Sequence, residues 1–180
     1  MADNTESALD ACIKALETAV RPSLDGTDPL AREQLHLTTG YLKFLRARLC
    51  YWQSRQLFEL RNSRRAAESL IGVATIASDA SRAQLAQAVA NARALEASDD
   101  FAADRVRQCL YELNGLISNL VRAASSAAPD IRQKVEQATI ASSKAWILMQ
   151  RSWFAPLGFD LRAGELPKLD TIFRQDVAEG

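Results

Sequence analysis

The chain has 180 residues, of which 48% are hydrophobic, and this supplies enough apolar surface for one domain with a substantial core. Its 22 basic and 22 acidic side chains cancel, so the whole molecule has no long-range field that would attract nucleic acid or an anionic membrane. The cysteines are odd in number, widely spaced and without a Cys-x-x-Cys pair, which predicts buried thiols in a reducing compartment: Cys12, Cys50 and Cys109.

The N-terminus is polar and acidic, so it lacks the basic and apolar segments of a secretory signal. No stretch of the sequence holds the ~18 apolar residues that a membrane-spanning helix requires. We therefore expect a cytoplasmic protein that does not bind membranes.

The first predicted helix begins near Thr5 or Ser7 and ends before the turn at residues 21–26. Its apolar residues recur at steps of three and four: Leu9, Cys12, Ile13, Leu16 and Val20. Asp28 and Pro29 then predict a helix start. Asp caps the free N–H groups, and the N–H that Pro lacks would have no partner within the helix at the first position. Apolar bulk at helical spacing carries this second helix to about Asn62.

No proline occurs in the 99 residues between Pro29 and Pro129, which favours long helices throughout this region. We expect a kink or short break at Asn62–Ser63, with the pattern continuing to about Ser78. A further helix follows Ser81, with a narrow apolar stripe at Leu85, Val89, Ala92 and Leu95. The next two are expected to begin at residues 98–100 and 128–130 and to end near Ala124 and residues 154–156, respectively.

From Leu157 the sequence changes, because Gly158, Gly164 and Pro167 interrupt the helical pattern while apolar residues continue. This composition is poor for disorder, so we predict an ordered arm with a last helix around Leu169 to Val177. The complete prediction is an all-α antiparallel bundle of five to six helices in one domain, with residues 1–156 as the bundle. Residues 157–180 form an irregular arm that packs on the bundle or on a partner subunit.

The sequence contains no catalytic constellation, phosphate-binding loop or dinucleotide fingerprint. Its one histidine, His36, follows Glu33 at Glu-x-x-His spacing, but a di-metal bundle needs such a motif on each of two helices, and a chain with one histidine cannot supply the second. The acidic residues Asp99, Asp100 and Asp104 could hold a cation. We favour the alternative that they lie at the start of a helix, where their negative charges interact favourably with the positive end of the helix dipole. We therefore predict no catalytic residue, no metal and no cofactor.

Charge is unevenly distributed along the chain, since residues 30–70 hold eight basic and three acidic groups while residues 1–29 hold two basic and six acidic groups. A basic helix with interleaved aromatic residues could follow a phosphate backbone. The alternative, which we favour, is that the acidic first helix lies beside the basic second one and neutralises it. We therefore expect no nucleic-acid partner.

Large aromatic residues gather in two places, one in the second helix and one near the end of the last long helix. The two groups are Tyr41, Phe44, Tyr51, Trp52 and Phe58, and Trp146, Trp153, Phe154 and Phe159. Such residues form a core, an interface or the wall of a pocket, and the sequence alone leaves these three possibilities open.

The segment Glu17–Gly26, followed by His36 and a helix to Leu49, resembles the start of a family of uncharacterised all-helical bacterial proteins. In that family an acidic helix ends in a Val/Leu-x-Pro-x-Leu-x-Gly turn, and a His stands near the start of the next helix. Their genes tend to neighbour those of acyl-CoA dehydrogenases and phosphotransferase-like kinases. The resemblance covers about a quarter of the chain and implies an accessory role near acyl-CoA metabolism, but no catalytic residue.

Two functional hypotheses follow from these observations. The first is a non-enzymatic helical interaction or accessory module that self-associates as a homodimer or joins an enzyme complex, with an interface at Trp153, Phe154, Phe159 and Leu161. The second is a bundle that binds an acyl or aromatic small molecule. Its walls would be Tyr41, Trp52 and Trp146, with Arg48 or His36 as the polar anchor.

Overall fold

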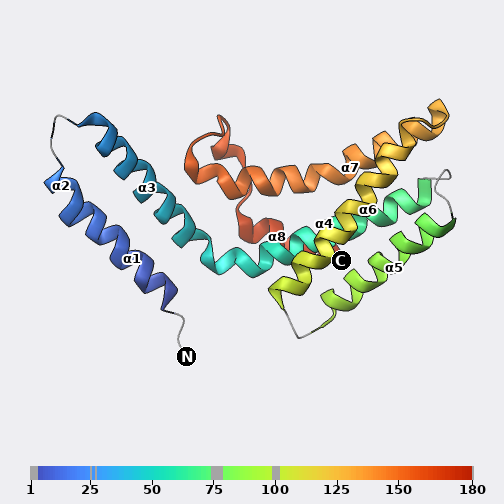
Figure 1. The fold of residues 1–180 in the computed structure, drawn as a ribbon, viewed down its shortest axis with the longest axis horizontal. Coiled ribbons are helices and arrows are strands. Elements are labelled where there is room, and N and C mark those ends of the chain that lie inside the picture. The colour runs from blue at the N-terminus through green and yellow to red at the C-terminus, as the bar shows by residue number, and fades with distance from the viewer. Residues whose placement is uncertain (1–3, 25, 27, 74–78, 99–101, 180) are drawn as a thin grey trace. The chain divides into compact units, whose positions relative to one another are not determined.

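The computed structural model describes residues 4–24, 26, 28–73, 79–98 and 102–179. These residues form an all-α helical structure, as the sequence predicts (Figure 1). The α-helices are α1 (Thr5–Ala15), α2 (Arg21–Ser23), α3 (Pro29–Arg48), α4 (Trp52–Val73), α5 (Asp79–Glu96), α6 (Ala103–Ala124), α7 (Pro129–Phe154) and α8 (Leu169–Glu179).

The chain divides into two compact units. The first unit comprises Met1–Trp52 with Trp153–Glu165, and the second comprises Gln53–Ser152 with Leu166–Gly180. The predicted C-terminal arm is therefore divided between them. Its first part belongs to the first unit, and α8 belongs to the second, where it confirms the helix predicted from Leu169.

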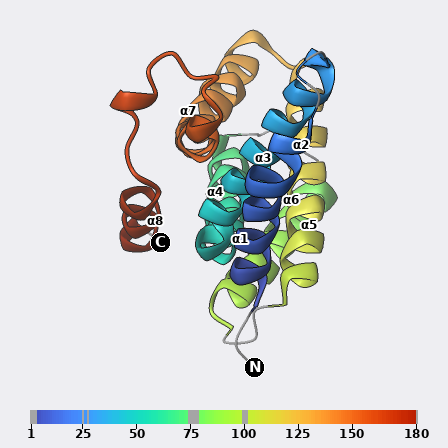
Figure 2. The same ribbon diagram turned by 90° about the vertical axis from the view of Figure 1, so that its left-hand side faces the viewer.

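A helical hairpin forms most of the first unit, with α1 and α3 lying side by side (Figures 1 and 2). A π-helical segment, Leu16–Val20, joins α1 to α2. The wider π-helical turn comes just before Pro22. A proline has no N–H to donate to the carbonyl four residues earlier, and its ring clashes with that carbonyl in a regular α-helix. The start of α3 is as predicted, since Asp28 Oδ1 accepts a hydrogen bond from the Ala31 N–H at 2.9 Å.

The predicted break at Asn62–Ser63 is wrong, because α4 continues through both residues. Asn and Ser cost a helix only a few tenths of a kcal/mol relative to good helix formers. Side chains of this stretch also bind other helices, for example Ser63 Oγ, which donates to Asn114 Oδ1 on α6 at 3.1 Å. The long predicted helix is instead interrupted earlier, by a 3-10 turn at Leu49–Tyr51.

The second unit contains the main hydrophobic core, which α4, α5, α6 and α7 build together. Its most deeply buried members are Leu60, Ala67, Leu70, Leu85, Ala88, Ala92, Val106, Leu113, Ala124 and Val135. The predicted stripe on α5 is confirmed, since its four residues are all buried. Small residues on this stripe permit α5 to approach its neighbours closely.

Helix α8 is amphipathic and buries three apolar side chains of the second unit: Leu169, Ile172 and Phe173. The Phe173 ring meets the Phe58 ring of α4 edge-on, with centroids 6.0 Å apart. An ordered apolar segment at this end of the chain is what the composition predicts.

Candidate functional site

The residues predicted to bind a small molecule are divided between the two units. His36, Tyr41, Arg48 and Trp52 belong to the first unit, and Trp146 belongs to the second. His36 is exposed, whereas Tyr41 and Trp52 are 52% and 51% exposed. Trp146, on α7, is 42% exposed.

Arg48 lies in an aromatic cluster of the first unit. Its Nε donates to the Trp153 carbonyl oxygen at 3.0 Å, and its guanidinium carbon lies 5.6 Å from the Trp153 ring centroid and 5.7 Å from that of Phe44. The Phe44 ring stacks on Phe154 at 5.7 Å and meets Trp153 edge-on at 6.5 Å. Burial lowers the pKa of Arg48. These groups fill the space between one another, which is typical of a packed core.

The four residues predicted to form an interface differ in exposure. Trp153 is 1% exposed and packs inside the aromatic cluster, so its ring is not at the surface. Phe154, Phe159 and Leu161 are exposed by 40%, 85% and 102%. The segment after α7 therefore presents large apolar side chains to solvent.

Ion pairs join the two helices of the hairpin on one side. Lys43 Nζ lies 2.7 Å from Glu17 Oε1, and Arg46 donates to both carboxylate oxygens of Asp10 at 2.9 and 3.1 Å. Two basic side chains of α3 therefore pair with the acidic first helix, as expected, while Arg61, Arg64 and Arg65 of α4 pair with carboxylates of the second unit. The hydrogen bond from Lys43 lowers the pKa of Glu17, and Asp10 raises that of Arg46.

The other side of the hairpin is mainly apolar. Residues three or four apart share one face of a helix, and on α3 the exposed Gln34 and Thr38 lie among the apolar residues of this side. The outer row on α1 and its π-helical extension consists of exposed small residues. The outer row on α3 consists of large residues with exposed fractions between 52% and 65%. Half-buried leucines lie between the two rows. We call this set the hairpin's apolar face: Ala8, Leu9, Cys12, Ala15, Leu16, Ala19, Leu30, Leu37, Tyr41, Leu42 and Leu45.

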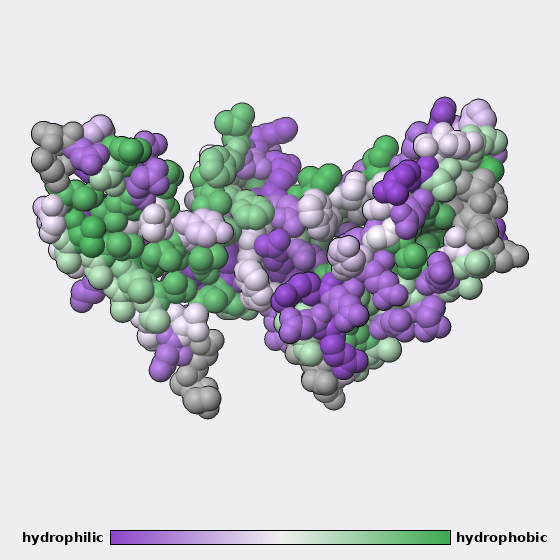
Figure 3. Space-filling view, in the orientation of Figure 1, coloured by the Kyte–Doolittle hydropathy of each residue, from purple (hydrophilic) through white to green (hydrophobic). Residues whose placement is uncertain are grey.

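Figure 3 shows hydrophobic residues gathered over the α1–α3 hairpin. Among the described residues of the first unit, few side chains are buried: Ile13, Leu35, Thr39, Phe44 and Trp153. Small units with so little core usually need a further partner, a metal or disulfides to be stable. The uncovered face is therefore the strongest candidate for a functional surface.

A second notable cluster lies in the second unit, where arginines and carboxylates form a partly buried network. Arg64 donates from Nε to Glu96 Oε1 at 2.8 Å and from Nη1 to both Glu68 oxygens at 3.0 Å. Arg93 also donates to Glu68, at 3.0 Å. Burial alone would lower the pKa of Arg64, but the hydrogen bonds to Glu96 and Glu68 outweigh it and raise that pKa.

The Asp176 carboxylate of α8 forms the other part of this network. It accepts from Arg61 Nη1 at 3.1 Å and from Arg65 Nη2, and its side chain is only 2% exposed. A groove of about 490 Å³ lies beside these residues, lined by Arg61, Arg64, Arg93, Glu96, Ala97 and Val177. Since carboxylates already bind its arginines, the groove is best explained as part of a structural ion-pair network.

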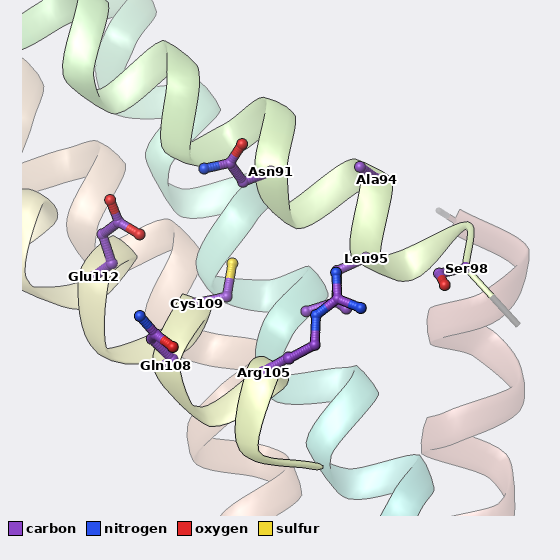
Figure 4. A pocket seen from close by; sticks show the side chains of 8 residues that line it. All are labelled: Asn91, Ala94, Leu95, Ser98, Arg105, Gln108, Cys109 and Glu112. Atoms are coloured by element: carbon purple, nitrogen blue, oxygen red, sulfur yellow. The ribbon is translucent and has the colours of Figure 1, made fainter. Parts of the chain in front are cut away.

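Another open cavity, of about 370 Å³, lies between α5 and α6 (Figure 4). Its lining residues are Asn91, Ala94, Leu95, Ser98, Arg105, Gln108, Cys109 and Glu112. Burial raises the pKa of the Cys109 thiol, so this sulfur stays protonated and is a poor nucleophile at neutral pH. The cavity thus offers polar contacts without an activated group.

The cysteine prediction is correct only in part. Cys109 is buried, as expected, but Cys12 and Cys50 are exposed, and all three thiols are free. Cys12 is exposed because it lies on the hairpin's apolar face, which the rest of the first unit leaves uncovered. The apolar pattern of the sequence predicts that Cys12 lies on an apolar face of the helix. It does not show whether other residues of the chain pack against that face.

The described residues contain no group of three or more His, Cys, Asp or Glu side chains that could hold a metal ion. Asp99 and Asp100 of the predicted acidic cluster lie outside the described residues. Asp104 stands in the first turn of α6 and pairs with Arg107 at 3.1 Å. Within the described ranges, no helix combines the length and apolar character needed to cross a membrane.

Comparison with known proteins returned no match: the chain fits no protein-family model, and neither a curated protein nor a solved structure is significantly similar to it. We therefore infer the function of the chain from the residues and contacts described above.

Proposed function

We propose that this protein is a non-enzymatic helical interaction module that binds a protein partner or itself through the hairpin's apolar face. The observation that carries the proposal is the exposure of Leu30, Leu37 and Tyr41, which are 65%, 55% and 52% exposed on one helix. Contiguous exposed apolar surface of this kind marks an interaction site in soluble proteins. The free thiols of the three cysteines favour a reducing compartment, and we place the protein in the cytoplasm.

A matched pair of variants on α3 tests this proposal. Leu37→Glu puts a charge on the apolar face, whereas His36→Glu puts the same side chain on the neighbouring, more polar side of the helix. Both wild-type residues are exposed, so circular dichroism should show the same folded helix content for both variants. We expect Leu37→Glu to lose self-association or partner capture while His36→Glu keeps it. Equal behaviour of the two variants would contradict the proposal.

A second candidate function is the binding of an acyl or aromatic small molecule. It is supported by the half-exposed rings of Tyr41 and Trp52, which contact Phe44 and Trp153 of the aromatic cluster around Arg48. The family resemblance noted above is also compatible with an acyl ligand. Titration with fatty acids and acyl-CoAs should then change tryptophan fluorescence saturably, and Trp52→Phe should remove the change. A flat titration at all chain lengths would eliminate this function.

A further inference from the structure

We infer that the partner of the hairpin's apolar face is a second copy of this chain, in a two-fold dimer in which α1 of each copy packs against α3 of the other. The inference rests on the proposed function and adds the partner and the arrangement. It makes the hairpin half of a four-helix bundle.

The shape of the face is complementary to itself. The outer row of the α1 side consists of small residues, Ala8, Cys12, Ala15 and Ala19, whereas the outer row of the α3 side carries Leu30, Leu37 and Tyr41. A two-fold axis parallel to the helices places the small row of each copy on the large row of the other. Contacts between small and large residues fill the interface at the packing density of a protein interior. A small row against a small row would leave a gap, and a large row against a large row would clash.

The charges of the hairpin are also compatible with a second copy. No residue that defines the apolar face carries a charge, and Glu33, three residues after Leu30 and four before Leu37, is an exposed charge at its edge. Asp10, Glu17, Lys43 and Arg46 are paired with one another on the opposite side. The apolar residues of two identical faces therefore meet without like-charge repulsion, and they offer no charge pattern that would select a partner of opposite sign.

The size of the face fits a dimer of this kind. From their exposed fractions, the residues of the apolar face expose on the order of 700 Å² together, close to the ~800 Å² that each partner buries in a standard interface. Homodimer interfaces are more apolar than other protein surfaces, which agrees with this composition.

Light scattering of the full chain tests the choice of partner with a second matched pair, on α1. We expect wild type to have twice the chain mass, with dissociation on dilution. Cys12→Glu places a charge in the small row and should weaken the dimer by at least tenfold in Kd. Thr18→Glu, at an exposed position outside the face, should leave the Kd unchanged. Equal Kd values for both variants would overturn the inference.

Oxidative cross-linking tests the arrangement. The ion pairs Asp10–Arg46 and Glu17–Lys43 place Cys12 at about the level of Leu45 within the hairpin, and an axis parallel to the helices preserves that level in the dimer. In a Cys50→Ser background, Leu45→Cys should therefore give a covalent dimer linked between position 12 of one copy and position 45 of the other, which a non-reducing gel separates from the chain-mass product of a link inside one hairpin. A disulfide between the two Cys12 residues in the background protein would show α1 against α1 and overturn the arrangement.

These experiments separate the inference from the proposed function. A chain that stays monomeric, yet captures another protein in a way that Leu37→Glu abolishes and His36→Glu does not, would overturn the inference and leave the interaction function in place. A monomer that captures nothing would contradict both.

Discussion

Asp176 is the residue whose substitution should destabilise the second unit most clearly through charge. Its side chain is 2% exposed, and it receives hydrogen bonds from Arg61 and Arg65, whose side chains are 17% and 28% exposed. Asp176→Asn keeps the volume but leaves two guanidinium groups facing a neutral amide. Removing one partner of a buried ion pair costs ~3–5 kcal/mol, and because both arginines can rehydrate in part, we expect about 3 kcal/mol.

Thermal unfolding followed by circular dichroism measures this loss. For a chain of this size, 1 kcal/mol shifts the Tm by ~2–4 °C, so the Tm of Asp176→Asn should fall by roughly 6–12 °C. Glu136→Gln is the control in the same unit, because Glu136 is 61% exposed and lies 3.7 Å from Arg132, a pair worth no more than ~0.5 kcal/mol. A Tm for Asp176→Asn within 2 °C of this control would correspond to a loss of ~1 kcal/mol or less in the free energy of unfolding. That result would show that the ion-pair network does not hold α8 in place.

Three further predictions concern the core, a thiol and a titration. Leu113→Ala, at a fully buried position of α6, should cost ~2–5 kcal/mol in urea unfolding, and a smaller loss would contradict the described core. Iodoacetamide at mildly alkaline pH should modify the two exposed cysteines quickly and Cys109 only after unfolding, as mass spectrometry will show. The Glu17 carboxyl should titrate below its ordinary pKa of 4.5 by NMR, and Lys43→Met should return its pKa toward that value. Because the pKa of Glu17 is lowered in the folded state, the contribution of the Glu17–Lys43 pair to stability is present above the ordinary pKa. That contribution is lost as the pH falls through the pKa of the folded state.

Helix positions could be predicted from the sequence where one strong physical signal decides them. Asp28 and Pro29 set the start of α3 because capping and the missing proline N–H act locally. The Leu85–Leu95 stripe of α5 is buried because its spacing leaves only one apolar face. The acidic and basic helices pair as the charge distribution predicts.

The interruption at Leu49–Tyr51 could not be predicted, because no Gly or Pro marks it. The preceding residue, Arg48, has φ −108° and ψ −10°, and its side chain binds the Trp153 carbonyl, which is 105 residues away in the sequence. A contact over that separation leaves no local pattern. The ion pairs of Asp176 with Arg61 and Arg65 could not be predicted for the same reason.

The candidate site could be predicted only in part. The sequence indicates apolar and aromatic residues suitable for an interface, but it does not show which of them the chain covers itself. Trp153 is enclosed by Phe44 and Trp52, whereas Leu37 and Leu30 on α3 remain exposed. Both groups follow the same helical spacing, so their different exposure depends on tertiary packing rather than on the pattern.

The mass of the full chain in solution at tens of micromolar tests the central claim, that this is an interaction module, most directly. The proposed two-fold dimer predicts a particle of twice the 19.8 kDa chain mass, reduced to a monomer by Leu37→Glu and unchanged by His36→Glu. A particle of 19.8 kDa at every concentration, with no protein captured by the immobilised chain, would contradict the claim.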